Sequence, residues 1–155
     1  MRYKHSRKVG LAHHLAILCI GLILATTTGR AAAAEGAAER VSARFASCGA
    51  GVRMTCVVDG DTFWLNGEKI RIADINTPET HGAGCVQEAL LGDAATRRLT
   101  ALLNNGPFTL AAVARDTDRY GRLLRIVTRK RESLGARLVS EGLAEPWRGR
   151  RRNWC

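Results

Sequence analysis

The chain lacks an apolar run long enough to span a membrane as a helix. Its longest apolar stretch runs from Leu15 to Ala25 and holds roughly eleven residues, whereas a spanning helix needs ~20. Basic residues precede this stretch and small residues follow it near Ala32, so residues 1–34 are typical of a signal peptide. An uncleaved membrane anchor is the alternative. We expect an exported protein, periplasmic or secreted, with no stable membrane insertion after cleavage.

Acidic residues are absent from the first 34 positions. All 14 acidic residues lie beyond them, whereas five of the 24 basic residues lie within them. Beyond position 34, 19 basic residues face 14 acidic ones, so the net charge is +5 in place of the +10 of the whole chain. Four arginines gather in an Arg/Trp-rich tail over 148–155. A basic surface attracts polyanions, although a merely solvated surface is the simpler explanation.

Residues with catalytic potential concentrate in the segment 57–80, VVDGDTFWLNGEKIRIADINTPET. Asp59 and Asp61 flank a glycine at a bend between two β-rich runs, and oxygen ligands gathered at a bend suit a hard cation such as Ca²⁺. Arg71 and Glu79 follow and provide a guanidinium group and a candidate general base. A metal ion, a base and a guanidinium group are what hydrolysis of a phosphodiester requires.

Alternating apolar residues and turn signals predict five strands and two helices. The Asn66-Gly67 pair is a strong hairpin signal, and Ser133 is a suitable N-cap for the second helix. Strands are expected over 54–58, 62–66, 69–75, 108–114 and 122–128, and helices over 86–104 and from Ser133 to about Glu141. This order predicts a mainly β (α+β) fold, a small closed five-stranded barrel of the oligonucleotide-binding (OB) type with two helices.

The third predicted strand contains an irregularity. Its apolar residues change parity near Ala73 and Asp74, which predicts a β-bulge there; a strand that ends at Ile72 is the alternative. The domain is expected over residues 54–147, and the Ala-, Gly- and Arg-rich residues 35–53 are expected to form a linker leading into it.

Three ordered motifs, VVDGDT, IRIADINTPE and DRYGRLLRIV (118–127), resemble those of the thermonuclease, or staphylococcal-nuclease-like, family. The resemblance extends from about Met54 to Leu143. It independently implies the OB fold and a metal-dependent nuclease that hydrolyses DNA or RNA, with Ca²⁺ as the cofactor. It also implies roles for individual residues: Asp61, Asn76 and the backbone carbonyl of Thr77 as metal ligands, Arg71, Glu79 and Arg122 as catalytic residues, and Arg119 and Tyr120 as contacts to the nucleotide.

Asn76 departs from the family pattern, in which an aspartate stands at this position. An amide oxygen can coordinate Ca²⁺, but one negative charge is lost, so weaker metal binding is expected. The alternative to a nuclease is a catalytically silent nucleic-acid-binding OB module whose metal site is eroded at Asn76. A protein-interaction module that uses the Arg/Trp-rich tail is a third reading. The protein is expected to be a monomer.

The cysteines predict two disulfides. Cys19 lies in the predicted signal peptide and lacks the small preceding residue of a lipoprotein cysteine, which leaves four. An even number in a small exported domain favours disulfides, and the spacings match no CxxC pair of a zinc site. Three pairings are possible, and we favour Cys48–Cys56, which closes a short loop, with Cys85–Cys155, which ties the tail near Glu79.

Overall fold

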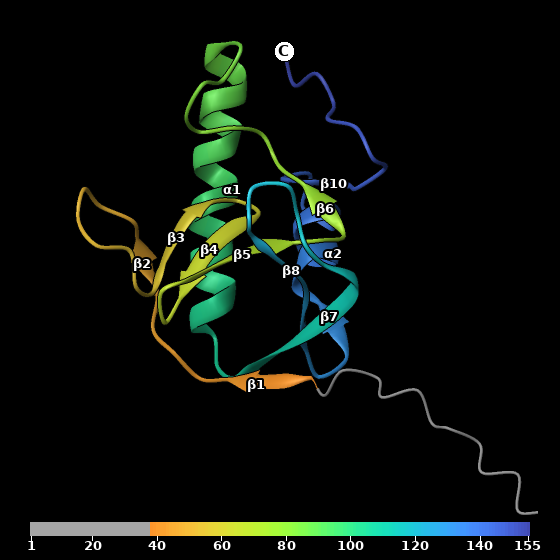
Figure 1. The fold of residues 1–155 in the computed structure, drawn as a ribbon. Helices are drawn as coiled ribbons and strands as arrows, with labels where there is room; N and C mark the ends of the chain where they lie inside the picture. Colours follow the sequence, from red (N-terminus) through yellow and green to blue (C-terminus); the bar gives the residue numbers. More distant parts are fainter. Residues whose placement is uncertain (1–37) are drawn as a thin grey trace, which may run out of the picture. The chain divides into compact units, whose positions relative to one another are not determined.

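The computed structural model describes residues 38–155; the predicted signal peptide, with Cys19, lies outside the described residues. Mainly β-structure is interrupted by one long and one short helix (Figure 1). The elements are β1 (Glu39–Val41), β2 (Ala46–Ser47), β3 (Cys56–Asp59), β4 (Thr62–Leu65), β5 (Glu68–Ile72), β6 (Ile75–Asn76), α1 (Val86–Asn104), β7 (Phe108–Thr117), β8 (Leu123–Arg129), β9 (Glu132–Ser133), α2 (Leu134–Ser140) and β10 (Glu145–Pro146).

Most strands belong to one curled sheet, in the order β1-β7-β8-β5-β4-β3-β2, with β9 paired to β8. Strands β6 and β10 form a separate antiparallel pair. The five strands predicted from the sequence correspond to β3, β4, β5, β7 and β8, and the long helix follows the β5–β6 region as expected. The mainly β, OB-like fold is thus confirmed. The sheet is a curled half-barrel with edges at β1 and β2, whereas the sequence predicted a closed barrel.

The core lies between the curled sheet and α1. Three phenylalanines, Phe45, Phe63 and Phe108, pack against one another with ring centroids 5.6 to 6.4 Å apart. Leu99 and Leu103 of α1 are buried in the same cluster. Burial of a side chain of this size stabilises the fold by about 1.5–3 kcal/mol. This packing holds the helix against the sheet and so determines where the loop before α1 can lie.

The expectation that residues 35–53 form a linker is wrong for 39–47. Strand β1 pairs with β7, strand β2 pairs in parallel with β3, and Val41 and Phe45 are buried in the core. Asn104 holds this segment as well, since its side chain both donates to and accepts from the backbone of Phe45, at 2.8 Å each. The segment contributes few apolar residues, and its partners are distant in sequence, so its composition resembles that of a linker.

The bulge predicted near Ala73 and Asp74 is also wrong. Strand β5 ends at Ile72, and Ala73 and Asp74 form a turn before β6. Two backbone hydrogen bonds to other segments hold this turn. The N–H of Ala73 donates to the carbonyl of Arg125 at 2.9 Å, and the carbonyl of Asp74 accepts from the N–H of Trp147 at 2.8 Å. Strand β8, which pairs with β5, and Trp147, which follows β10, thus satisfy these backbone groups, and the chain turns at Ala73 without a bulge.

Local sequence signals agree with the structure elsewhere. Helix α1 has the predicted bounds, and the Oγ of Ser133 accepts a hydrogen bond from the N–H of Ala136, at 3.0 Å, at the start of α2. Asn66 and Gly67 have φ of 52° and 86°, which a tight hairpin turn between β4 and β5 requires.

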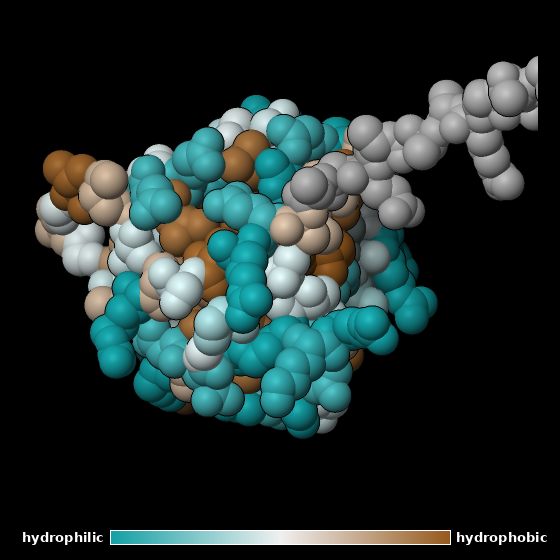
Figure 2. Space-filling model, turned by 90° about the horizontal axis from the view of Figure 1, so that it is seen from below, coloured by the Kyte–Doolittle hydropathy of each residue, from teal (hydrophilic) through white to brown (hydrophobic). Residues whose placement is uncertain are grey.

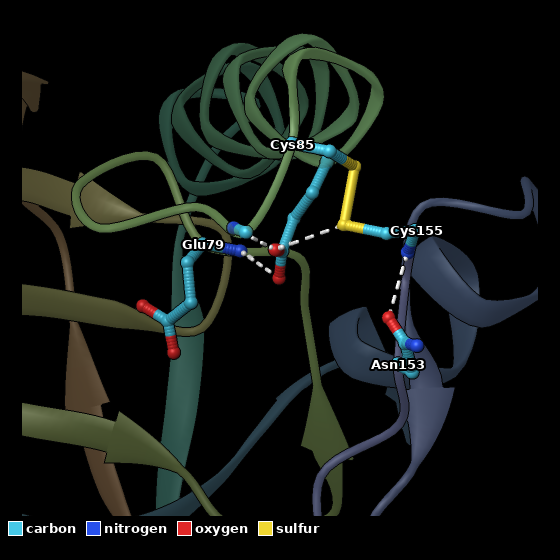
Figure 3. Close-up of a disulfide and its surroundings, with 6 residues drawn as sticks. Glu79, Cys85, Asn153 and Cys155 are labelled. Carbon is cyan, nitrogen blue, oxygen red and sulfur yellow. Dashed lines mark hydrogen bonds between the residues drawn. A yellow bond between two sulfur atoms is a disulfide. The ribbon is translucent and has the colours of Figure 1, made fainter.

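Both favoured disulfides, Cys48–Cys56 and Cys85–Cys155, are present. The second joins the residue just before α1 to the last residue of the chain (Figure 3). The face seen from below in Figure 2, on the side of β1, carries mainly hydrophilic side chains with apolar ones between them. Within residues 38–155, no helix combines the length and the apolar character needed to cross a membrane.

Candidate active site

The bend between β3 and β4 places Asp61 against β6. Gly60 makes this possible, because a Cβ there would lie 2.6 Å from the Cβ of Ala95 on α1 and 2.9 Å from the Cγ2 of Thr77. The bend is closed by Asp59, whose Oδ1 accepts a hydrogen bond from the N–H of Asp61 at 3.1 Å. The Asp59-Gly60-Asp61 sequence therefore gives a bend that only glycine allows to pack so closely on the helix.

Asp61 and Arg71 form a buried ion pair in which Nη2 of Arg71 lies 3.2 Å from Oδ2 of Asp61. Arg71 also donates to the carbonyls of Ile72 at 2.8 Å and Ile75 at 3.1 Å, at the turn that follows β5. The ring of Trp147 lies 4.9 Å from the guanidinium carbon. Burying charges requires such pairing and hydrogen bonding. Arg71 is thus held rigidly beside Asp61.

Arg122 joins this group through Thr62. Its Nη1 donates to the Oγ1 of Thr62 at 3.4 Å, and that hydroxyl donates to Oδ1 of Asp61 at 2.8 Å. Its Nε donates to Oδ2 of Asp118 at 2.7 Å, so the carboxylate fixes the direction of the guanidinium group. Burial by itself raises the pKa of Asp118, but hydrogen bonds from Arg122 and from the N–H of Tyr120 outweigh it and lower the pKa below its usual value.

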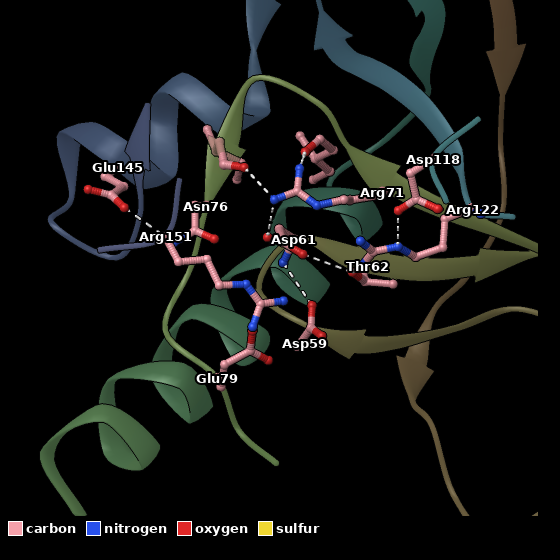
Figure 4. Close-up of polar contacts among 12 residues, drawn as sticks. Asp59, Asp61, Thr62, Arg71, Asn76, Glu79, Asp118, Arg122, Glu145 and Arg151 are labelled. Carbon is pink, nitrogen blue, oxygen red and sulfur yellow. Dashed lines mark hydrogen bonds and ion pairs between the residues drawn. The ribbon is translucent and has the colours of Figure 1, made fainter. Parts of the chain in front are cut away.

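Asn76 is buried, with 3 % of its surface exposed, and lies on the side of Asp61 opposite to Arg122 in Figure 4. Its Nδ2 donates to Oε1 of Glu145 on β10, at 3.3 Å. Figure 4 shows the amide oxygen of Asn76 on the side that faces Asp61. Thr77 follows Asn76 directly and packs its methyl group against Gly60. The metal-ligand role that the family resemblance implies for Thr77 belongs to its backbone carbonyl and not to this side chain.

Glu79 is positioned by the close approach of α1. A Cβ on Gly92 would lie 2.7 Å from the carbonyl oxygen of Glu79 and 2.9 Å from that of Pro78, so the helix contacts this backbone directly. The N–H of Glu79 donates to Oε1 of Glu88, on the first turn of α1, at 3.4 Å. The carboxylate itself pairs with Nη1 of Arg151 from the tail, at 2.6 Å.

The carboxyl of Asp59 is buried beside two other carboxylates of the site. Burial, followed by the proximity of the carboxylates of Asp61 and Glu79, raises the pKa of Asp59 to about 7. Among residues 38–155, no three His, Cys, Asp or Glu side chains are placed to hold one metal ion. The available donors are the carboxylate of Asp61, the amide oxygen of Asn76 and backbone carbonyls, the oxygen types that Ca²⁺ takes. This donor set fits a hard cation with fewer charged ligands than usual.

Arg119 and Tyr120 lie in the exposed loop between β7 and β8. Tyr120 is 66 % exposed, so it does not pack on the sheet. Its hydroxyl accepts a hydrogen bond from Nη2 of Arg119 at 2.6 Å, and the guanidinium carbons of Arg119 and Arg122 lie 4.7 and 5.5 Å from its ring. The loop thus presents an aromatic face flanked by two cations, next to the Arg122 end of the site.

The structure brings the predicted residues Asp61, Arg71, Asn76 and Glu79 together, with Arg122 linked through one hydroxyl (Figure 4). Sequence reasoning missed four residues that complete this group: Thr62, Asp118, Glu145 and Arg151. The Asp118–Arg122 spacing inside the DRYGR turn could have indicated one of them. The contacts of Glu145 and Arg151 join positions about seventy residues apart, and no local pattern marks them.

Comparisons with known proteins show which family the chain resembles. The family described as staphylococcal nuclease homologue matches residues 69–153. The chain is 37 % identical over 99 residues to Endonuclease YncB of Bacillus subtilis (strain 168), which covers 60 % of this chain and 46 % of that protein. It is equally identical over 99 residues to the SPbeta prophage-derived endonuclease YokF of the same organism, covering 60 % and 33 %. The chain thus spans less than half the length of these relatives. Because the family match covers more than half of this chain, the chain belongs to the staphylococcal nuclease homologue family.

Proposed function

We propose that this protein is an exported nuclease that hydrolyses phosphodiester bonds of DNA or RNA with the help of Ca²⁺. The observation that carries the proposal is the convergence of Asp61, Arg71, Asn76 and Glu79 at one point of the fold. A protein that only binds nucleic acid needs no general base. Here Glu79 follows Pro78, and its backbone is packed against Gly92 of α1. The names of the two relatives, both endonucleases, add support.

In this proposal Asp61, Asn76 and the backbone carbonyl of Thr77 would hold the cation. When bound, Ca²⁺ would supply positive charge to neutralise the phosphate under attack. Asn76 in place of an aspartate makes this site less negative, so the affinity for Ca²⁺ is expected to be modest.

Side chains of the protein carry out proton transfer and charge stabilisation. Glu79 accepts a proton from the attacking water, which a carboxylate beside the reacting phosphate can do. Arg122 donates hydrogen bonds to phosphoryl oxygens as negative charge builds on them, and Asp118 keeps its guanidinium group aimed. Arg71, held beside Asp61 by several hydrogen bonds, adds a second fixed positive charge.

Arg119 and Tyr120 are proposed to contact the nucleotide next to the reacting phosphate. An exposed tyrosine ring flanked by guanidinium groups offers a base a stacking surface beside a basic track for the backbone. Two disulfides support an oxidising compartment, periplasmic or extracellular, and the protein is proposed to act there as a monomer.

A catalytically silent nucleic-acid-binding module is the second candidate. One observation favours it: within the described residues, no three acidic or imidazole side chains gather around one metal position. Under this reading the protein would retain DNA without cutting it.

Digestion of single-stranded DNA by the oxidised protein tests the proposal. Reactions contain Ca²⁺, Mg²⁺ or chelator, and a Glu79→Gln variant is compared with a Glu132→Gln control, which removes the same charge from an exposed position on β9. Ca²⁺-dependent cutting is expected in the wild type and the control, with a loss of 100-fold or more in Glu79→Gln, in line with ~10²–10⁴-fold for general base catalysis. Binding without cutting under every condition would favour the silent module.

A further inference from the structure

The C-terminal tail, residues 148–155, is anchored at both ends across the candidate site. At its start the N–H of Trp147 donates to the carbonyl of Asp74, and the ring of Trp147 lies on Arg71. At its end Cys155 is bonded to Cys85, next to the loop that carries Glu79 (Figure 3). The tail therefore spans from the Arg71 side of the site to the Glu79 side.

Between these anchors the tail contacts two residues of the site directly. Arg151 pairs with Glu79 at 2.6 Å, and Figure 4 shows its guanidinium group directed toward the Glu79 carboxylate. The N–H of Arg152 donates to Oε1 of Glu145, the same atom that accepts from the Asn76 amide. The tail is thus part of the wall of the site.

The tail and Glu145 line an open basic hollow of about 330 Å³. Four arginines and one acidic residue line it: the lining residues are Glu145, Arg148, Arg150, Arg151, Arg152 and Asn153. The carboxylate is already engaged by hydrogen bonds from the Asn76 amide and the Arg152 N–H. A hollow with this surplus of positive charge suits a phosphate group, which guanidinium forks bind through paired hydrogen bonds.

The pair between Arg151 and Glu79 is suited to exchange for a phosphate. The Glu79 side chain is 31 % exposed and that of Arg151 is 63 % exposed, and ion pairs of this exposure contribute little to stability because water screens them. A phosphate entering the site can take over the Arg151 fork without a large energetic cost, and Glu79 is then free of its partner.

We propose that the tail is a substrate-binding strap, in which Arg151 binds a phosphate of the nucleic acid backbone and the Cys85–Cys155 disulfide holds Arg151 in place. The inference rests on the proposed function for its ligand, a polyanionic nucleic acid. It assigns the disulfide a role in affinity, because tethering the chain end keeps the guanidinium group at high local concentration beside the site. Reduction of the disulfide therefore weakens substrate binding.

The experiment measures binding apart from cleavage. Fluorescence anisotropy follows a fluorescein-labelled phosphorothioate oligonucleotide, which keeps the backbone charge and resists hydrolysis, as it binds the oxidised protein. Four proteins are compared with the wild type: Arg151→Ala; Arg151→Lys; Arg40→Ala, which removes an equal charge from an exposed residue on β1; and the double variant Cys85→Ser/Cys155→Ser. Arg151→Ala is also combined with the double variant.

We expect Arg151→Ala to raise Kd about tenfold at low salt and to reduce the salt slope by about 0.7, the value for one phosphate contact on a single strand. Arg151→Lys should lie between Arg151→Ala and the wild type, because lysine keeps the charge but not the fork. Loss of the disulfide should raise Kd, and Arg151→Ala should then add little. Arg40→Ala should change Kd less than about twofold.

Three results would overturn the strap: equal effects of Arg151→Ala and Arg40→Ala, tighter binding by Arg151→Ala, or an undiminished Arg151→Ala effect without the disulfide. Tighter binding would mean that Arg151 blocks the site. If the wild type fails to cut DNA but Arg151→Ala weakens binding as expected, the nuclease proposal fails and the strap stands. If the wild type cuts and Arg151→Ala binds like the control, only the strap fails.

Discussion

Replacing Gly92 by alanine should displace Glu79 while leaving the fold largely intact. The new Cβ would lie 2.7 Å from the carbonyl oxygen of Glu79, whereas ordinary contacts of a Cβ begin at 3.4 Å. The loop that carries Glu79 must therefore move by about 0.7 Å, the difference between these distances. A misplacement of ~1 Å at a reacting group can reduce the rate by ~10²-fold. We expect the cleavage rate to fall by about 10- to 100-fold.

The stability of the same variant should change much less. Overpacking costs about 1–3 kcal/mol, but alanine favours the helix over glycine by about 1 kcal/mol. The net loss is then about 0–2 kcal/mol, or a fall in Tm of no more than about 8 °C. Circular dichroism melting would check this. Gly49→Ala is the matched control, since no atom lies within 4 Å of a Cβ added there and its activity should not change.

Gly92→Ala with wild-type activity would refute the reasoning, provided that Glu79→Gln is inactive in the same assay. In that case the approach of α1 does not determine the position of the carboxylate. If Glu79→Gln is itself active, the assignment of Glu79 as the general base is wrong, and Gly92→Ala has no reason to lose activity.

Two further predictions concern the charges around the site. Asn76→Asp should tighten Ca²⁺ binding, because it adds a negative charge beside Asp61; equal affinities in calorimetric titrations would contradict this. Asp118→Asn should lower the free energy of unfolding at pH 7 by about 2 kcal/mol, since hydrogen bonds to a buried carboxylate are weakened. Because folding lowers the pKa of Asp118, its contribution is present above the usual value of 3.8 and is lost as the pH falls through the folded pKa. Urea unfolding at pH 7 and pH 3 should therefore show a smaller difference between variant and wild type at pH 3, and a constant difference would show that the charge is not responsible.

The role of the tail gives the two disulfides different expected consequences. Cys48–Cys56 joins positions eight residues apart, at the ends of the short loop between β2 and β3. Cys85–Cys155 joins positions 70 residues apart and ends at the loop that carries Glu79. Its removal therefore bears on the geometry of the site as well as on stability.

Much of this protein could be predicted from its sequence because the signals are local. The bounds of α1, the Asn66-Gly67 turn and the Ser133 cap depend on hydrogen bonds and backbone angles within a few residues, which composition and spacing reveal. The ordered motifs around Asp61 and Arg122 were likewise enough to predict the family and the OB-like fold.

Tertiary structure decided what joins distant segments. Strands β1 and β2 pair with β7 and β3, so a segment with the composition of a linker became part of the sheet. The Ala73–Asp74 turn is held by Arg125 and Trp147, which no pattern within β5 could indicate. The pairing of Arg151 with Glu79 arises because the tail is anchored on both sides of the site. The sequence by itself thus determined the elements and the residue types of the site, whereas the packing of α1 and the tail determined where their charges lie.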